Sequence, residues 1–287
     1  MKDFAGRTAV ITGGGTGMGR ELARQLVAEG CNVAMCDVSA ANMAETKALC
    51  VGAGLPQGMR VTTHVADVSD EKQLVRFRDE MAEEHKIDHI HLLFNNAGVS
   101  LGAAPLWELT AAQWEWIFGV NIFGVINGIK TMVPRMRRHG ERGHVVNTAS
   151  IGGLQVNAKL RNGSYAMTKY AVVAASEALA LDLEDSNLGV SVLCPALVAT
   201  TLHASSQRRP ARLGGPYQHP GAETAKAWQS AGLSPDDVGR RVLDAVSRAE
   251  FFIFTHEEPR AWIEERHARL LAGFDSITRY NAGKDAT

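Results

Sequence analysis

Short apolar runs alternate along this chain with longer amphipathic segments. The apolar runs, rich in β-branched residues, predict six strands: Thr8–Thr12, Asn32–Asp37, Val61–Asp67, His91–Asn95, Val145–Ser150 and Val190–Pro195. Helices are expected in the intervals between them. Near-continuous apolar strands separated by helices predict a parallel sheet covered on both faces, which is a doubly wound α/β fold with three αβα layers. Ligands bind such sheets beyond the carboxyl ends of the strands, so functional residues are expected directly after strands.

The alternating pattern stops between Leu202 and about Ser234, where Arg, Pro, Gly and Gln dominate. Residues 202–234 are expected to form a substrate lid, because long loops in compact domains are usually functional; a solvated surface excursion is the alternative. Beyond them, Phe251–Phe254 predicts a last strand and Glu257–Ala272 a helix. No linker divides the sequence, so residues 1–287 are expected to form a single domain with a small substrate lobe.

Composition and charge narrow the range of partners. The 30 basic and 31 acidic side chains leave a formal charge of -1, which creates no field to attract nucleic acid or an anionic membrane. We find no apolar run of membrane-spanning length and no room for a signal peptide before the first strand, so a cytoplasmic location is expected.

Cysteines and histidines give no metal signal. The four cysteines, Cys31, Cys36, Cys50 and Cys194, show no CxxC spacing and lie in or beside apolar stretches, which favours reduced core thiols. His89 and His91 stand two apart at the start of a strand, with no third ligand in evident register. Because zinc sites need three or four convergent ligands, no metal site is expected.

A glycine-rich turn directly follows the first strand, in the stretch Thr12-Gly13-Gly14-Gly15-Thr16-Gly17-Met18-Gly19. Glycines there let the backbone approach a pyrophosphate, whose charge would face the amino terminus of the following helix. The spacing is G-x-x-x-G-x-G rather than the G-x-G-x-x-G of the general dinucleotide motif. The turn therefore indicates dinucleotide binding, with tight packing alone as the alternative.

Acidic residues follow the second and third strands. Asp37 stands where a carboxylate is expected to accept hydrogen bonds from an adenosine ribose, and it would repel a 2′-phosphate. Gly14, Gly15 and Val38 supply no cation for that phosphate, so NAD is expected to be preferred and NADP remains possible. A solvated strand-end carboxylate is the alternative for Asp37. Asp67 and Val68 would bracket the adenine, although an aspartate here also suits a helix cap.

Tyr165 and Lys169 stand at i and i+4, on one face of a predicted helix. A fixed cation favours the phenolate, so Lys169 is expected to lower the pKa of Tyr165. Tyr165 could then act as a general base toward an alcohol, or as a general acid during ketone reduction. Ser150, at the end of the preceding strand, could hold the substrate oxygen. Asn121, a polar residue in an apolar helix, is a candidate to join these residues in the site. The alternative is a buried asparagine that only makes hydrogen bonds to neighbouring backbone.

In this order and approximate spacing, the following motifs resemble the classical short-chain dehydrogenase/reductase family: Thr12 to Gly19, Asn95-Asn96-Ala97-Gly98, Asn121, Ser150, Tyr165 and Lys169. The resemblance covers roughly Gly6 to Thr200. It implies a Rossmann-type fold and a catalytic tetrad of Asn121, Ser150, Tyr165 and Lys169. In that tetrad Lys169 also binds the nicotinamide ribose, and Asn121 holds a water that links Lys169 to solvent.

The resemblance further implies that Asn95 to Gly98 stabilise the central sheet and line the cofactor site, while Pro195 to Thr200 flank the nicotinamide. Together with the motifs it predicts these cofactor contacts: Gly13, Thr16, Gly17, Met18, Gly19, Asp37, Asp67, Val68, Asn95, Ala97, Gly98, Tyr165, Lys169, Pro195, Val198 and Thr200.

Three features depart from the family pattern. Pro195-Ala196 replaces a frequent Pro-Gly, and Ser150 and Tyr165 are separated by two more residues than is common. The chain also continues through a helix after the last strand, which leaves a dimer as a fair alternative to the family's usual tetramer. Either assembly is expected to use the apolar faces around Ala111–Arg138 and Tyr170–Asp185.

The predicted activity is the interconversion of a secondary alcohol and a ketone. The stretch Gly119 to Gly128 is similar to bacterial dehydrogenases that act on benzylic alcohols of lignin-derived aromatics. A wall of Leu154, Val156 and Leu202 would suit a bulky hydrophobic or aryl substrate, although a core role for each is the alternative. Two other classes remain open: a dinucleotide-sensing regulator without catalysis, and an epimerase or dehydratase with the same fold.

Overall fold

The computed structural model of this chain describes residues 3–284, apart from residues 53, 56, 87, 88, 158–160, 218–222, 224, 225, 228 and 229. Clustering of contacts divides it into two compact units, Met1–Thr255 and His256–Thr287. The first unit carries the sheet and the motifs. The expectation of a single domain over the whole chain stays a prediction.

The first unit is built on a parallel sheet of seven strands in the order β3-β2-β1-β4-β5-β6-β7. The strands are β1 (Thr8–Thr12), β2 (Asn32–Asp37), β3 (Val61–Val65), β4 (Leu92–Asn95), β5 (Gly143–Thr148), β6 (Leu188–Cys194) and β7 (Phe252–Phe254). The order reverses direction between β1 and β4, as in doubly wound sheets. The predicted α/β fold class is therefore confirmed, and the predicted strands are right to within two residues at each end.

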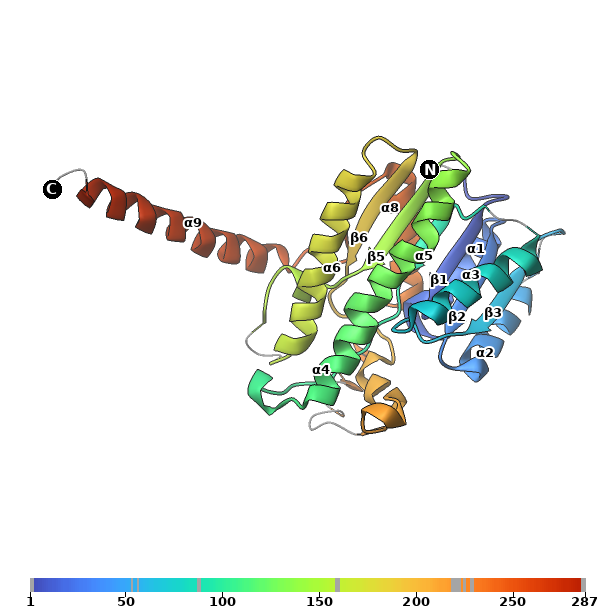
Figure 1. Ribbon diagram of the computed structural model, residues 1–287, viewed down its shortest axis with the longest axis horizontal. Helices are drawn as coiled ribbons and strands as arrows, with labels where there is room; N and C mark the ends of the chain where they lie inside the picture. Colours follow the sequence, from blue (N-terminus) through green and yellow to red (C-terminus); the bar gives the residue numbers. More distant parts are fainter. Residues whose placement is uncertain are drawn as a thin grey trace. The chain divides into compact units, whose positions relative to one another are not determined.

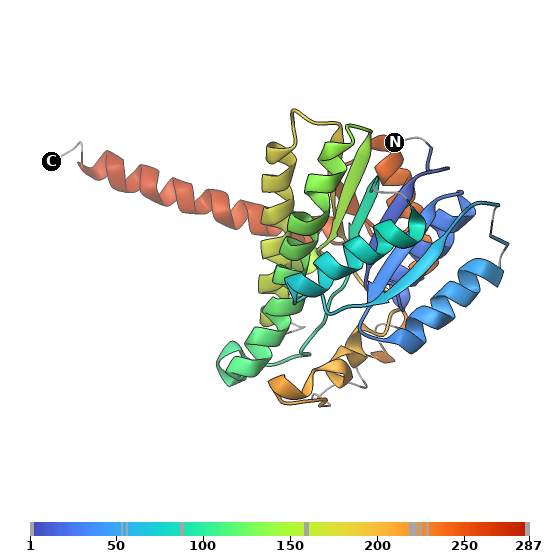
Figure 2. The same cartoon turned by 45° about the vertical axis from the view of Figure 1, so that its right-hand side comes forward.

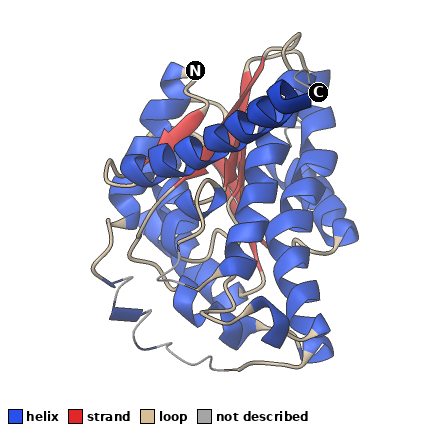
Figure 3. Cartoon of the chain, turned by 90° about the vertical axis from the view of Figure 1, so that its left-hand side faces the viewer, coloured by secondary structure: helices blue, strands red, loops and turns tan. Residues whose placement is uncertain are grey.

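Helices cover both faces of the sheet (Figure 1). The helices of this unit are α1 (Gly17–Ala28), α2 (Ala40–Gly52), α3 (Glu71–His85), α4 (Ala111–Phe118), α5 (Gly124–Arg138), α6 (Gly163–Asp182) and α8 (Pro235–Arg248). The views turned by 45° and 90° show the strands between the helical layers (Figures 2 and 3). This is the predicted three-layer arrangement.

Successive side chains of each strand point to opposite faces of the sheet, which divides the core into two halves. Ala9 and Ile11 of β1 pack with α1, α2 and α8, whereas Val10 between them packs with α3, α5 and α6. Every residue of β1 is buried, which is why the sequence shows a continuous apolar run rather than an alternating one. The four cysteines are free and buried, as expected of core thiols.

A π-helical turn, η2 (Gly119–Phe123), joins α4 to α5, so Ala111–Arg138 forms one continuous helical stretch of 28 residues. By length and composition alone this stretch could cross a membrane, contrary to the expectation that no segment is long enough. However, 56% of its most apolar window is buried. Met132, Val133 and Met136 of this stretch are buried in the core cluster that contains Val10 of β1.

The second unit contains α9, which begins at Arg260 and ends at Lys284. The helix begins three residues later than the predicted Glu257–Ala272 and continues twelve residues further. No proline follows Pro259, and the only glycines in this extension are Gly273 and Gly283. Large apolar side chains are exposed along this helix, among them Leu270, Phe274 and Ile277.

Residues 202–234 begin with two short 3-10 helices, η4 (Leu202–Arg208) and η5 (Ala211–Leu213). This segment (orange in Figures 1 and 2) lies beside α4, and Leu213 packs there with Trp116 and Ile117. At its far end, Leu233 pairs with Val198, so the excursion returns to where it left the fold. Part of the predicted lid falls on residues outside the described ones.

Buried histidines make the stability of this fold depend on pH. Burial lowers the pKa of His144 from 6.5 to about 4, and its Nε2 lies 2.7 Å from Oγ of Ser191. Burial also lowers the pKa of His85 to about 4. Because both folded pKa values lie below the unfolded value, the unfolded chain takes up protons first, and stability falls as the pH drops from about 6.5 toward 4.

We therefore expect the free energy of unfolding, measured in urea, to decrease between pH 7 and pH 5. In His144→Gln the decrease should be smaller by about 2 kcal/mol, the value for one group titrating over 1.5 pH units. An equal decrease in both proteins would contradict the assignment to His144.

Candidate active site

A cavity of about 320 Å³ opens at the carboxyl ends of the strands. It is lined by residues that follow six strands, β1 to β6, together with parts of α4, η2, α6 and the 202–217 segment. Its lining comprises Gly13, Thr16, Gly17, Met18, Asp37, Val38, Ala66, Asp67, Val68, Asn96, Ala97, Gly98, Val99, Trp116, Val120, Thr148, Ala149, Ser150, Tyr165, Lys169, Pro195, Ala196, Leu197, Val198, Thr200, Thr201, Leu202, Arg208 and Pro210. Most predicted site residues therefore meet at one place.

In the turn after β1, glycine is required for a different physical reason at different positions. Gly13 and Gly17 adopt left-handed φ values of 67° and 56°. A Cβ atom on Gly19 would lie 2.1 Å from the carbonyl oxygen of Gly13, so only glycine lets α1 start this close to the turn. A Cβ on Gly14 would lie 2.6 Å from Cβ of Met35. Gly14 and Gly19 thus serve packing, while Gly13 and Gly17 also line the cavity.

The amino terminus of α1 fits a phosphate group. The N-cap, Thr16, makes no side-chain capping bond, and the first turn carries no acidic residue. The free N–H groups and the helix dipole there favour an anion. Asn96 steadies the turn, because its Nδ2 donates to the carbonyl oxygens of Thr12 at 3.1 Å and Gly13 at 3.2 Å. These residues could hold the pyrophosphate of a dinucleotide.

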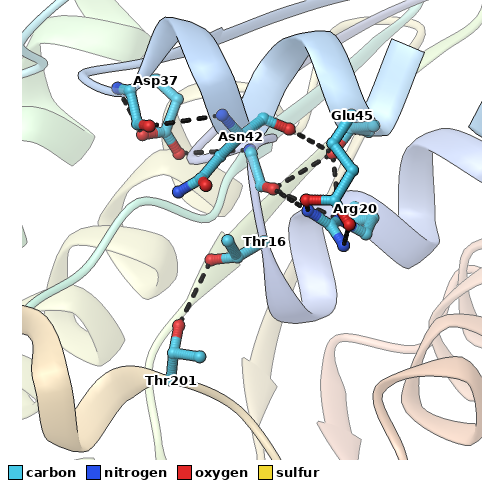
Figure 4. A network of polar contacts seen from close by, with 9 residues as sticks. Thr16, Arg20, Asp37, Asn42, Glu45 and Thr201 are labelled. Atoms are coloured by element: carbon cyan, nitrogen blue, oxygen red, sulfur yellow. Dashed lines mark hydrogen bonds and ion pairs between the residues drawn. The ribbon is translucent and has the colours of Figure 1, made fainter. Parts of the chain in front are cut away.

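Asp37 lies at the end of β2 with its carboxylate tied to two backbone amides (Figure 4). Oδ2 accepts from the N–H of Gly15 at 3.1 Å, and Oδ1 accepts from the N–H of Ser39 at 3.0 Å. Arg20 is held by Glu45, with Nη1–Oε1 and Nη2–Oε2 distances of 2.9 and 2.8 Å, and it also donates to the carbonyl oxygen of Gly15. The nearby guanidinium is therefore already paired with a carboxylate.

Asp67 lies in the cavity wall beside Val68 and does not cap the following helix. Its Oδ1 accepts from the backbone N–H of Ser69 at 2.9 Å and from Oγ of the same residue at 2.7 Å. The N-cap of α3 is Asp70, which accepts from the N–H of Lys72. The capping alternative for Asp67 is therefore wrong.

Ser150, Tyr165 and Lys169 meet at the deep end of the cavity. Ser150 comes two residues after β5, and its Oγ accepts from the N–H of Gly152 at 3.1 Å. Tyr165 and Lys169 share a face of α6, with Nζ 5.5 Å from the centre of the tyrosine ring. Nζ also donates to the carbonyl oxygen of Thr148 at 2.7 Å, and Lys169 is only 2% exposed.

Burial governs the protonation of this pair. It raises the pKa of Tyr165 to about 12, against a smaller opposite effect of a hydrogen bond with Ser150. It also lowers the pKa of Lys169 from 10.5 to about 8. The net pKa of Tyr165 therefore lies above the ordinary value, because desolvation of the phenolate is the largest effect on it. The expected lowering of this pKa by Lys169 stays a prediction.

Asn121 is completely buried in the π-helical turn, and its side chain is occupied by protein partners. Oδ1 accepts from the N–H of Val99 at 2.8 Å, while Nδ2 donates to the carbonyl oxygen of Val99 and to Oγ1 of Thr168, both at 3.0 Å. The amide therefore ties η2 to the loop after β4 and to α6. Both hydrogens of Nδ2 are therefore used by the protein, so the side chain has no donor left for a water.

Three predicted site residues do not line the cavity: Gly19, Asn95 and Asn121. Asn95 is buried under α5, where its Nδ2 donates to Oδ1 of Asn147 at 2.8 Å. Gly128 of α5 leaves room for this side chain, because a Cβ there would lie 2.0 Å from Oδ1 of Asn95. Asn95 therefore joins β4 to β5 beneath α5 and does not face the cavity. Sequence reasoning missed Trp116 and Arg208 in the lining, since neither directly follows a strand.

The substrate side of the cavity differs from the predicted wall. Leu202 lines it, but Leu154 packs into a core cluster and Val156 is 55% exposed outside the lining. Trp116, 5% exposed, and Val120 provide apolar surface instead. The 202–217 segment is attached here, since Oγ of Ser205 donates to the carbonyl oxygen of Ser100 and accepts from its N–H.

Comparison with known proteins matches residues 7–211 to the family model for short chain dehydrogenases. The chain is 31% identical over 283 residues to a CLA biosynthesis dehydrogenase/reductase of Lactiplantibacillus plantarum, covering 94% of this chain and 95% of that protein. It is 32% identical over 276 residues to a C alpha-dehydrogenase of a Sphingobium species, covering 94% and 87%. A Burkholderia phymatum short-chain dehydrogenase/reductase, solved in complex with NAD, superposes with a TM-score of 0.88 at 34% identity, covering 95% of this chain and 97% of that one.

The chain therefore belongs to the short-chain dehydrogenase/reductase family, as the motifs indicated. Membership makes it a nicotinamide-dependent oxidoreductase acting on CH–OH groups.

Burying the Lys169 ammonium destabilises the fold, which can be measured. A pKa lowered from 10.5 to about 8 corresponds to a penalty of about 3 kcal/mol on the charged form. Lys169→Met removes this penalty but leaves the carbonyl oxygen of Thr148 unpaired, which costs about 1–2 kcal/mol. We expect the variant to be more stable than the wild type by about 1–2 kcal/mol at pH 7, with its activity lost.

The gain should depend on pH. Because the folded pKa of Lys169 lies below the unfolded value, the penalty is complete below pH 8 and disappears as the pH rises toward 10.5. Urea unfolding at pH 7 and pH 10 measures both effects. A variant less stable than the wild type at pH 7 would contradict the argument.

Proposed function

We propose that this chain interconverts a secondary alcohol and a ketone with Tyr165 as general acid and base, Ser150 as the group that holds the substrate oxygen, and Lys169 as the residue that binds the nicotinamide ribose. The observation that carries the proposal is the convergence of these three side chains in one cavity with the glycine-rich turn. A bound nicotinamide would supply the hydride acceptor or donor.

The proton transfer can be followed at named atoms. In oxidation, the Tyr165 phenolate takes the hydroxyl proton of the alcohol while the carbon loses hydride. In reduction, the Tyr165 phenol returns that proton to the oxygen. Oγ of Ser150 donates to the substrate oxygen as negative charge develops there, which is worth most in a cleft that excludes water.

The pKa values suit the two directions differently. Burial keeps Tyr165 protonated near neutral pH, since its pKa is raised to about 12. The phenol is thus ready to act as the acid in ketone reduction, whereas alcohol oxidation requires the phenolate. Oxidation should therefore speed up as the pH rises, whereas reduction should not.

The proposed substrate is a bulky hydrophobic or aryl alcohol or ketone. Trp116, Val120 and Leu202 give apolar surface to the cavity that Ser150 lines. The similarity to a C alpha-dehydrogenase of a Sphingobium species agrees with an aryl substrate. Residues 202–234 would serve as the lid over this substrate; Leu233, near the end of this segment, pairs with Val198, which precedes it.

The proposed cofactor preference is for NAD. Asp37 lines the cavity, and the neighbouring Arg20 forms an ion pair with Glu45. A 2′-phosphate at Asp37 would meet like charge without a free cation from Arg20. The solved relative in complex with NAD agrees with this preference.

Assembly into a homo-oligomer also remains a proposal. Phe123, 53% exposed, and Leu181, 70% exposed, belong to the two helical faces expected at the interface. Exposed large apolar side chains at these two faces support the proposal, because apolar surface is often covered in protein–protein contacts.

Tyr165→Phe tests the catalytic assignment. The variant keeps the ring and its packing but cannot transfer the proton, so kcat should fall by at least about a hundredfold. Dinucleotide binding, followed by fluorescence titration with NADH, should remain. The increase of oxidation rate with pH should disappear from the residual activity.

Met167→Leu is the matched control, because Met167 lies on the same helix, is 46% exposed and does not line the cavity. It should retain the activity of the wild type. Near-normal turnover of Tyr165→Phe would show that another residue transfers the proton.

Asp37→Asn tests the cofactor preference. It removes the charge and keeps one of the two acceptor oxygens, for the N–H of either Gly15 or Ser39, so the advantage of NAD over NADP in kcat/KM should narrow. Adding Val38→Arg should narrow it further or invert it, by giving the phosphate a cation. In the double variant, the ratio of kcat/KM with NAD to kcat/KM with NADP should fall about a hundredfold, which corresponds to a change on the order of 2–3 kcal/mol in transition-state free energy.

The measurement is the initial rate at 340 nm with each cofactor over a range of concentrations. Ser39→Ala is the control, since it alters a neighbour of Asp37 without changing charge. A wild type that already prefers NADP would refute the role given to Asp37.

A further inference from the structure

Four potential metal ligands gather at the edge of the sheet opposite the active site. His89 and His91 precede β4, whereas His139 and Glu141 lie between α5 and β5. One ligand atom from each lies within 4.8 Å of the others. Sequence reasoning expected no third ligand beside the histidine pair, because His139 and Glu141 are about 50 residues away in the chain. Parallel pairing of β4 with β5 brings the two segments together.

We propose that His89, His139 and Glu141 bind a divalent transition-metal ion such as Zn²⁺, and that His91 orients the glutamate. Imidazole nitrogen and carboxylate oxygen are ligands that Zn²⁺ accepts, typically three from the protein with water in the fourth position when a site is open. The proposal is independent of the proposed catalytic function, since none of these residues lines the active-site cavity.

Hydrogen bonds assign a separate role to each histidine. Nε2 of His139 donates to the carbonyl oxygen of Ile90 at 2.9 Å, which leaves the lone pair on Nδ1 facing Glu141. This is the arrangement of metal-binding histidines, in which the second ring nitrogen donates to a backbone carbonyl and fixes the ring. On metal binding, Nδ1 of His139 would exchange the N–H of Glu141 for the ion.

His91 cannot bind the ion in its present orientation. Its Nδ1 accepts from the N–H of Thr8 at 3.0 Å, so the proton of the neutral ring lies on Nε2, which donates to Oε2 of Glu141 at 3.0 Å. A metal on Nε2 would leave the ring without a proton. His91 therefore holds the carboxylate in place.

His89 provides the second nitrogen. Its Nδ1 lies 2.9 Å from Oε1 of Glu141, and its ring stacks on that of His139 with the centres 4.7 Å apart. A change of tautomer moves the proton to Nε2 and frees Nδ1 for the ion. Tetrahedral bonds of about 2.0–2.2 Å require ligand atoms roughly 3.3–3.6 Å apart. The side chains of His89 and Glu141, 49% and 44% exposed, have room to make this adjustment.

Two further features bear on the site. Gly140, between His139 and Glu141, adopts a left-handed φ of 70°, and the N–H of Glu141 donates to Nδ1 of His139 across this turn at 3.1 Å. Arg7 lies close to the carboxylate, with Nη1 3.2 Å from Oε2. Its charge opposes a cation, so we expect a site of moderate affinity that connects the end of α5 to the starts of β4 and β5.

The test is titration of the full-length protein with Zn²⁺ by calorimetry, using a purification tag without histidine. The wild type should bind one ion per chain with a Kd well below about 1 mM. His139→Ala and Glu141→Gln should each abolish this binding. Co²⁺ bound to the wild type should give the visible absorption of a tetrahedral site, which the same variants should lose.

His91→Gln distinguishes an orienting residue from a ligand. It should weaken binding by about 10- to 100-fold, as expected for a residue that positions a ligand, without abolishing it. His267→Ala, which removes an exposed histidine on α9, is the control and should bind like the wild type. Zn²⁺ should also raise the melting temperature of the wild type but not that of His139→Ala.

Three results would overturn the proposal: Zn²⁺ binding that survives both His139→Ala and Glu141→Gln, equal loss in His267→Ala, or no binding below about 1 mM. Complete loss in His91→Gln would overturn the assignment of three ligands. Circular dichroism confirms folding, and unchanged turnover of each folded variant separates this site from the catalytic one.

Discussion

The buried ammonium group of Lys169 is the constraint on which the arrangement of the active site depends. A charge this deep requires an acceptor, and the carbonyl oxygen of Thr148 supplies one at 2.7 Å just where β5 ends. That contact fixes α6 against the sheet and with it the position of Tyr165, one turn earlier. The same burial raises the pKa of Tyr165 to about 12 and lowers that of Lys169 to about 8, so position and proton affinity have a single physical cause.

Asn121 shows how the neighbouring helices adapt to this site. Its amide makes hydrogen bonds to both backbone groups of Val99 and to Thr168, the residue next to Lys169. To reach these partners from a helix, the chain widens into the π-helical turn of Gly119–Phe123. Such turns leave a backbone carbonyl without its usual helical partner and often occur at functional sites. The asparagine thus contributes by shaping the backbone between three elements.

The sequence predicts the sheet and most of the site because strands, glycines and strand-end polar residues are local signals. Thr8–Thr12 and Asn32–Asp37 are recovered residue for residue, since every position in β1 and nearly every one in β2 is buried. What it misses depends on distance in the chain. Trp116 reaches the cavity through helix packing, Asn95 turns away from it under Gly128, and the pKa of Tyr165 depends on how completely the fold removes water.

The two edges of the sheet differ in a way that follows from the direction of its strands. At the carboxyl edge, backbone N–H groups and the amino terminus of α1 face outward, and the residues there suit an anionic cofactor. At the amino edge, α5 ends after three arginines, and the loops that follow carry His139 and Glu141 beside His89 and His91. Helix carboxyl ends favour cations, so the carboxyl end of α5 favours positive charge at this edge, whereas the amino terminus of α1 attracts phosphate at the other. A parallel sheet therefore offers two chemically opposite edges, and the residues proposed for catalysis lie at only one of them.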